Sequence, residues 1–352
     1  MNATNMTDAE KGDLTIKFSI YIVQGVTLIS INLAIFLAII RRPTLRKQYS
    51  ILCGLFVTNG LMGCATLSAG VGRLIVLLTN TTDEFVGTQD CMWKIWNLFF
   101  IWTDPMSAII LLVISTDRLL ALSIPIRYYK AAGKLGNYQL AASHVFMACS
   151  VITGWTATLL WTDNEKQYSK ICWSSESMNS SYFIYHTWLR IIAALLSVLL
   201  FFVVVVLMRI RVKKAAPMRN LSQQNITVFS KRQLRFTVSM GISCLFTCIF
   251  YIFPICVELY TVIVDSESQT LGFVTTYSLI ISNLSPISNV IIVFHRHVDI
   301  RRSLLSLISC GTISSTHVSA TLQAIVTTVR TAQRLRTSTV APSTRPHRSI
   351  SR

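Results

Sequence analysis

The stretch PMSAIILLVISTDRLLALSIPIRYYK, residues 105–130, decides the fold. Its first twelve residues carry no charge, and they lead directly to an acid–base couple, Asp117 and Arg118. A charge at the centre of a lipid bilayer costs about 2.5–3.5 kcal/mol on insertion scales, and much less at the interface. The pattern therefore predicts a membrane-spanning helix whose apolar part lies in the hydrocarbon and whose charged couple lies at the membrane surface.

The whole chain has the composition of a membrane protein. Of its 352 residues, 52% are hydrophobic and 13% are charged, and the mean hydropathy is +0.54. A helix needs about 20 mostly apolar residues to cross the hydrocarbon core. Seven segments are long enough: residues 18–40, 50–72, 95–124, 138–161, 182–208, 236–264 and 270–294. We expect an all-α integral membrane protein, built as a bundle of seven transmembrane helices.

The distribution of charge predicts that the N-terminus lies outside the cell. In that orientation 25 of the 32 Lys and Arg residues fall on the cytoplasmic side, with only two of the 15 acids, Asp117 and Asp299. This asymmetry follows the positive-inside rule, so the net charge of +17 indicates a membrane surface and no nucleic-acid partner. Glycosylation triplets add weaker support, because four fall outside and three do not. The four predicted glycosylation sites are Asn2, Asn5, Asn80 and Asn179.

Four regions are expected along the chain. Residues 1–17 form an extracellular tail and residues 18–294 form the bundle. In residues 295–310 apolar side chains recur at helical spacing, which predicts an amphipathic helix on the inner leaflet. Cys310 at its end is either palmitoylated or a free thiol. Residues 311–352, rich in Ser, Thr and Arg and without an acid, predict a disordered cytoplasmic tail.

No catalytic, phosphate-binding or metal-binding motif occurs in the sequence. The six histidines form no H-x-x-x-H or H-E-x-x-H pattern, and there is no C-x-x-C. We therefore expect neither an enzyme nor a bound metal or cofactor. The loop between the fifth and sixth spans carries eight bases and no acid. Its partner is either anionic membrane lipid or a cytoplasmic protein, and charge alone does not separate the two.

The end of the third span resembles a motif of the rhodopsin-like G-protein-coupled receptors. That family carries Asp/Glu-Arg-Tyr at the inner end of helix three, followed by A-x-x-x-P-x-x-Y. Here Asp117 and Arg118 match two of the three triplet positions. The second motif is matched by Ala121, Pro125 and Tyr128. Two motifs at the correct spacing make this a fairly specific resemblance.

Other landmarks of that family agree in part. Pro254 resembles the proline of helix six, and Pro286 resembles the proline of the Asn-Pro-x-x-Tyr motif in helix seven. The resemblance also implies a disulfide between Cys91 and Cys172 on the outer face, where oxidation is allowed. Departures include Tyr251-Ile252 in place of the usual Cys-Trp. This divergence is similar to that of the nematode chemosensory serpentine receptors.

The resemblance implies a plasma-membrane receptor that binds an extracellular small molecule or peptide and activates a heterotrimeric G protein. Asp117 would hold Arg118 at rest, and the helices that carry Pro254 and Pro286 would move on activation. A basic residue that merely snorkels at a helix end is the alternative for Arg118. A receptor kinase and an arrestin are the expected partners of the tail. The alternative functions are a transporter or channel that uses intramembrane charges, and a decoy receptor.

Charges inside the spans predict where a ligand binds. Asp104 precedes Arg118 by almost four helical turns, about 21 Å, so both lie on one face of the helix. Asp104, Arg190 and Glu258 either contact a ligand or pair only to hold helices together. Phe100 stands where amine receptors carry their aspartate, which disfavours an amine. The candidate pocket residues are Phe100, Asp104, Arg190, Tyr251, Glu258 and Tyr277.

A second group of residues resembles the polar network that binds sodium in many relatives. Its members are Asn32, Asn59, Ser107 and Ser285. Because Asn59 replaces an aspartate, the charge that attracts the ion is missing. We predict weak or absent sodium sensitivity of ligand affinity, measured in sodium chloride against choline chloride. A clear sodium dependence of the unmodified protein contradicts this prediction.

Overall fold

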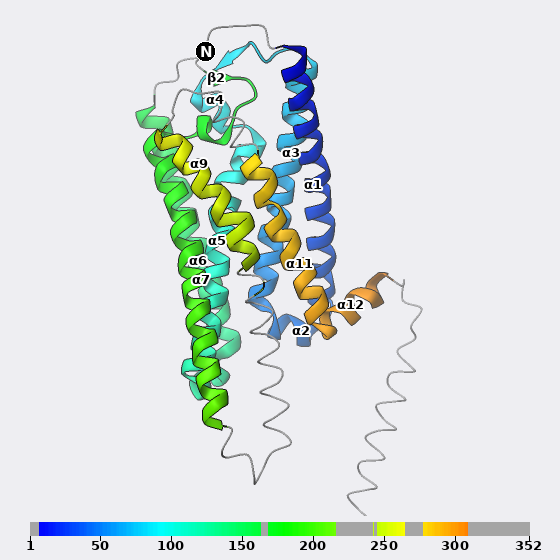
Figure 1. The fold of residues 1–352 in the computed structure, drawn as a ribbon, viewed down its shortest axis with the longest axis vertical. Coiled ribbons are helices and arrows are strands. Elements are labelled where there is room, and N and C mark those ends of the chain that lie inside the picture. The colour runs from blue at the N-terminus through cyan, green and yellow to red at the C-terminus, as the bar shows by residue number, and fades with distance from the viewer. Residues whose placement is uncertain (1–6, 163–167, 216–241, 243–244, 265–276, 309–352) are drawn as a thin grey trace, which may run out of the picture. The chain divides into compact units, whose positions relative to one another are not determined.

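The computed structural model describes residues 7–162, 168–215, 242, 245–264 and 277–308 (Figure 1). Two compact units divide the chain, Met1–Ser303 and Leu304–Arg352, and all the long helices belong to the first. The helices and strands are α1 (Asp8–Ile40), α2 (Pro43–Gln48), α3 (Ser50–Leu78), β1 (Phe85–Val86), α4 (Thr88–Met92), α5 (Ile95–Ser123), α6 (Pro125–Trp161), β2 (Tyr168–Ser169), the 3₁₀ helix η1 (Ser174–Ser177), α7 (Ser180–Ala215), the π-helix η2 (Cys248–Ile252), α9 (Phe253–Val264), α11 (Leu284–Arg296) and α12 (Val298–Ile308).

Helices lie in the described parts of all seven predicted spans. Six helices are long and apolar enough to cross a membrane, and they correspond to the first five predicted spans and the seventh. The sixth span is described only in part, by the shorter apolar helix Leu245–Val257. The seventh is a continuous span over Tyr277–His295 that includes α11. Asn2, Asn5, Cys310, most of the basic loop and the tail at 311–352 lie outside the described residues.

Several helices extend past the boundaries predicted from hydropathy. The first begins at Asp8, inside the predicted extracellular tail, because Thr7 caps it. The Thr7 hydroxyl accepts a hydrogen bond from the Glu10 N–H at 3.3 Å, and the Glu10 carboxylate accepts one from the Thr7 N–H at 2.9 Å. This reciprocal capping box starts a helix in polar sequence. Similarly, α11 continues to Arg296 and α12 starts only at Val298, so the predicted boundary at 294 is wrong by a short margin.

Helix α5 lies at the centre of the bundle. It packs against α3, α6 and α7, and α3 in turn packs along α1. Glycines let α1 and α3 approach closely: a Cβ atom on Gly25 would lie 2.6 Å from the backbone nitrogen of Leu67. Small residues are common where membrane helices meet, because hydrocarbon gives no hydrophobic drive and packing must replace it.

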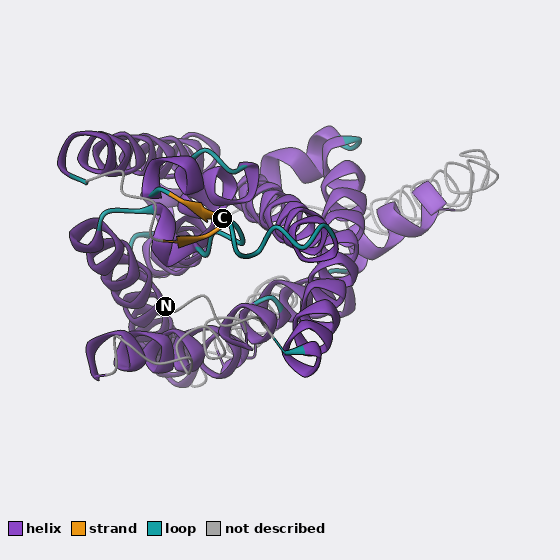
Figure 2. Cartoon of the chain, turned by 90° about the horizontal axis from the view of Figure 1, so that it is seen from above, coloured by secondary structure: helices purple, strands orange, loops and turns teal. Residues whose placement is uncertain are grey.

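The loops at the end of the bundle where α1 begins are tied together. Strand β1 pairs antiparallel with β2, with Phe85 opposite Ser169. Figures 1 and 2 show the two strands over the helix ends rather than beside the helices. The predicted disulfide between Cys91 and Cys172 is present in this region. The loop that contains Cys172 is therefore attached both to β1 and to the start of the third span.

The two predicted glycosylation sites that the structure describes lie at this same end. Asn80 is exposed, and its side-chain oxygen accepts a hydrogen bond from Lys11 at 3.3 Å. Asn179 is half-buried before α7, and its amide donates to the Thr162 hydroxyl at 3.1 Å. Asn80 thus offers the more accessible amide.

Candidate functional site

A cavity of about 570 Å³, including its open mouth, lies among the helix ends at the end of the bundle where α1 begins, and we call it the outer cavity. Its walls come from α1, α3, α5, α7, α9, the start of the seventh span and the loop around η1. Phe100, Asp104 and Arg190, three of the predicted pocket residues, line this cavity together.

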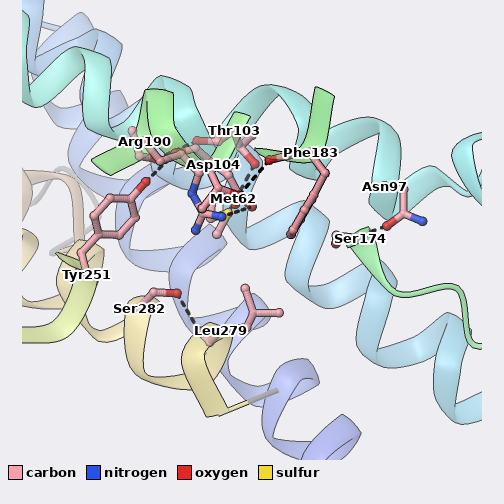
Figure 3. A network of polar contacts seen from close by, with 12 residues as sticks. Met62, Asn97, Thr103, Asp104, Ser174, Phe183, Arg190, Tyr251, Leu279 and Ser282 are labelled. Atoms are coloured by element: carbon pink, nitrogen blue, oxygen red, sulfur yellow. Dashed lines mark hydrogen bonds and ion pairs between the residues drawn. The ribbon is translucent and has the colours of Figure 1, made fainter. Parts of the chain in front are cut away.

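A polar node joins three helices beside the cavity. Asp104 on α5 and Arg190 on α7 are both buried, and the Asp104 Oδ2 atom lies 3.7 Å from the Arg190 Nη1 atom. The Tyr251 hydroxyl donates a hydrogen bond to the backbone carbonyl of Asp104 at 2.7 Å. The Arg190 guanidinium also lies 5.7 Å from the centre of the Tyr251 ring, a cation–π distance. Figure 3 shows the three side chains converging. Pairing of Asp104 with Arg190 was one of the alternatives left open by the sequence, and the two groups do lie together here.

The position of Tyr251 depends on a local irregularity of its helix. Tyr251 belongs to η2, a single π-helical stretch that directly precedes α9 and Pro254. A π-helical turn contains an extra residue, which changes the direction of its side chains, and such turns are frequent at functional sites. Tyr251 contacts the α5 backbone. It is not among the residues that line the outer cavity, but it lines a second cavity next to it.

A second cavity, about 400 Å³, lies next to the node. Three of the four predicted polar-network residues line it, namely Asn59, Ser107 and Ser285, together with Pro286. The fourth, Asn32, donates a hydrogen bond to the Leu28 carbonyl of its own helix at 2.8 Å. Asp104 and Ser282 line both cavities. Asp104 is therefore the charged group at the junction of the two.

Arg73 lines the outer cavity but was not predicted as a pocket residue from the sequence. Its side chain is only 1% exposed. Its Nε and Nη2 atoms donate hydrogen bonds to the carbonyls of Ile171 and Cys172, each at 3.2 Å, and its guanidinium lies 4.5 Å from the Trp173 ring. The second span was predicted to end at residue 72, which placed Arg73 in a loop. The apolar run that continues to Leu78 was the signal that it lies within the helix.

The carbonyl of Cys172 connects the outer loop to α3 and α5 through hydrogen bonds. Besides Arg73, it accepts hydrogen bonds from the Trp96 indole at 3.3 Å and the Asn97 amide at 3.4 Å. Cys172 has φ of 51°, in the left-handed region that non-glycine residues seldom adopt. The disulfide and these donors together hold the loop over the cavity.

Two other predicted pocket residues, Tyr277 and Glu258, are not among the described residues that line the outer cavity. Tyr277 is exposed, and the Lys17 ammonium lies 5.1 Å from its ring centre. It is not among the residues that line the cavity, because the seventh span places it beside α1 at the rim. The side chain of Glu258 lies outside the described residues, although its backbone belongs to α9.

The acid–base couple at the other end of α5 forms a second polar site. The buried Asp117 carboxylate places its Oδ2 atom 3.0 Å from the Arg118 Nη2 atom. Its Oδ1 atom accepts a hydrogen bond from the Tyr128 hydroxyl at 2.8 Å. Helix α5 ends at Ser123 and α6 starts at Pro125, so this tight connection returns Tyr128 to Asp117. One carboxylate thus binds groups from two helices.

Comparison with known proteins identifies the chain. The family model for the serpentine type 7TM GPCR chemoreceptor Srsx matches residues 26–308. The chain belongs to the Srsx family of serpentine chemoreceptors. The predicted resemblance to G-protein-coupled and nematode chemosensory receptors is therefore confirmed, as are the seven-helix fold and a multi-pass position in the plasma membrane. Srsx proteins are a receptor family, and a search of curated proteins found no match to this member.

Glu176 in η1 is a half-buried carboxyl group of the loop that contains Cys172. Its carboxylate accepts a hydrogen bond from the Trp173 N–H at 2.8 Å. Burial raises the pKa of Glu176 to about 7, although that hydrogen bond and the Arg73 charge act in the opposite direction. A carboxyl whose pKa is raised in the folded state stabilises the fold below its unfolded pKa, near 4.5, and that stability is lost as the pH rises through about 7.

We predict that the melting temperature of the purified receptor falls between about pH 5 and about pH 8, and that Glu176→Gln reduces this fall. The amide keeps a hydrogen-bond acceptor for Trp173 but does not titrate. Glu84→Gln, a change at an exposed acid of the same outer region, is the matched control and should leave the slope as in the unmodified receptor. Equal slopes in all three proteins contradict the prediction.

Proposed function

We propose that this receptor binds an extracellular small molecule in the outer cavity and in response activates a heterotrimeric G protein at its inner face. The observation that carries the proposal is the arrangement along α5. One end of this helix contributes Asp104 to the cavity, and the other end holds the Asp117–Arg118 couple. The N-terminal end of the bundle is extracellular in this proposal, and the tail is cytoplasmic, in agreement with the distribution of basic residues.

The polar node is the element on which a ligand acts. The 3.7 Å between Asp104 and Arg190 exceeds the 2.7–2.9 Å of a strong charge-assisted hydrogen bond. A ligand that binds either charge changes this loose pair, and with it the contacts of Tyr251. Because Tyr251 lies three residues before Pro254 in an irregular turn, a small movement there tilts the remainder of the sixth span. The ligand selects the tilted state by binding it more tightly.

The tilt of the sixth span releases Arg118 from Asp117 at the inner end of α5. Family members often hold the arginine of the triplet with a second acid at the base of helix six. The corresponding sequence here, SKRQLRF at residues 230–236, contains no acid and lies outside the described residues. The resting state therefore depends on Asp117, which also binds Tyr128. We expect appreciable signalling without ligand. Phosphorylation of the tail and arrestin binding complete the proposal.

Arg118→Ala tests the coupling role directly. We expect loss of ligand-free second-messenger output at unchanged surface expression, because the group that contacts the G protein is removed. Arg302→Ala, a change at an exposed arginine of α12, is the control and should retain the output. Equal background output from the unmodified receptor and Arg118→Ala rejects the expected basal signalling. Undiminished output from Arg118→Ala rejects the coupling role.

Tyr251→Phe tests the node. It removes one hydroxyl and its 2.7 Å hydrogen bond to α5, which contributes about 1 kcal/mol. If the bond holds the resting state, the active fraction should rise by about fivefold, measured as ligand-free signalling per receptor at the surface. Tyr260→Phe, at an exposed tyrosine of α9 in the same predicted span, is the matched control. Unchanged or lower basal output from Tyr251→Phe contradicts the proposed role of the node.

A further inference from the structure

The described walls of the outer cavity carry more positive than negative charge. Two guanidinium groups, Arg73 and Arg190, face one carboxylate, Asp104. All three are buried, with 1%, 7% and 7% exposure. A buried charge without a counter-charge carries a penalty of several kcal/mol. The site therefore favours an occupant that supplies negative charge.

Arg73 is the guanidinium that lacks a matching acid in the cavity wall. Its two hydrogen bonds go to the neutral carbonyls of Ile171 and Cys172, which orient the group without neutralising it. Within the described part of the chain, no hydrogen bond uses its Nη1 atom. Glu176 attracts Arg73 electrostatically, but with a pKa of about 7 its carboxyl is partly protonated at neutral pH. Arg190, by contrast, has Asp104 within 4 Å.

The remaining walls specify the rest of the occupant. Aromatic and aliphatic side chains surround the cavity, among them Tyr21, Phe100, Trp173, Phe183 and Ile255. They suit an apolar chain or ring.

We propose that the ligand is a small organic monocarboxylate, whose carboxylate binds Arg73 beneath the outer loop and whose apolar body packs among the aromatic side chains. This inference rests on the proposed ligand-binding function and names its ligand class. The single surplus positive charge among the described lining residues matches a monoanion. A phosphate monoester, which approaches two negative charges at neutral pH, exceeds it. Guanidinium and carboxylate also match each other in planar, two-point geometry.

The test uses the purified full-length receptor in lipid nanodiscs, without a G protein. The probes are straight-chain and phenyl-substituted monocarboxylates of about four to ten carbon atoms, a size that suits the cavity. Each is paired with the primary amide of the same skeleton, and hexyl phosphate is added as the phosphate probe. Affinity is obtained from the rise in melting temperature with ligand concentration.

We expect at least one carboxylate to bind about tenfold or more tightly than its amide, equivalent to about 1.4 kcal/mol. Arg73→Gln should abolish that preference, whereas Arg46→Gln, at an exposed arginine, should preserve it. Arg73 also fastens the outer loop, so Asp104→Asn provides a second, independent variant. It increases the positive surplus and should strengthen carboxylate binding, whereas a merely structural Asp104 would weaken it.

Several results overturn the inference. They are amides that bind as tightly as carboxylates, no binding by any carboxylate of the panel, tighter binding of hexyl phosphate, and weaker carboxylate binding by Asp104→Asn. Binding is measured here without coupling. Loss of signalling in cells with intact carboxylate binding would therefore count against the proposed function and leave the ligand class standing.

Discussion

Charged groups cannot face hydrocarbon, and this constraint organises the whole receptor. A charge at the membrane centre is stabilised only when it turns inward and finds a partner. Asp104 does so with Arg190, and Arg73 does so with the carbonyls of the outer loop. These contacts decide which faces of α3, α5 and α7 turn inward. The cavity lies where those faces meet, so the charged groups of these helices also line the cavity.

Helix α5 connects the cavity with the Asp117–Arg118 couple. Its backbone at Asp104 accepts the Tyr251 hydroxyl, and its inner end holds Arg118 through Asp117. The node beside the cavity has a loose ion pair, a cation–π contact and a π-helical turn, all of which can rearrange without breaking the packing of the long helices. The inner couple, in contrast, is a compact cluster of one carboxylate with two partners. In the proposed function, ligand binding acts on the more adjustable of the two sites.

Much of this architecture was predictable from the sequence, for reasons that individual residues make plain. Apolar length marked the spans, and the cost of burying charge predicted that Asp104, Arg190 and Glu258 face the interior or one another; Asp104 and Arg190 do lie together. Arg73 was missed because hydropathy falls at a charge even where the helix continues. The role of Tyr251 was missed because a π-helical turn leaves no simple periodic signal. The position of Tyr277 at the rim depends on how the seventh span meets α1, which is a property of packing and not of local sequence.

The orientation of the bundle is the premise that links the cavity to the outside and Arg118 to the cytosol. Epitope tags at the two ends of the full-length receptor test it most directly, by antibody labelling of intact and permeabilised cells. The account predicts that the N-terminal tag is labelled on intact cells, and that the C-terminal tag is labelled only after permeabilisation. The reverse pattern would place the cavity in the cytosol and contradict the account.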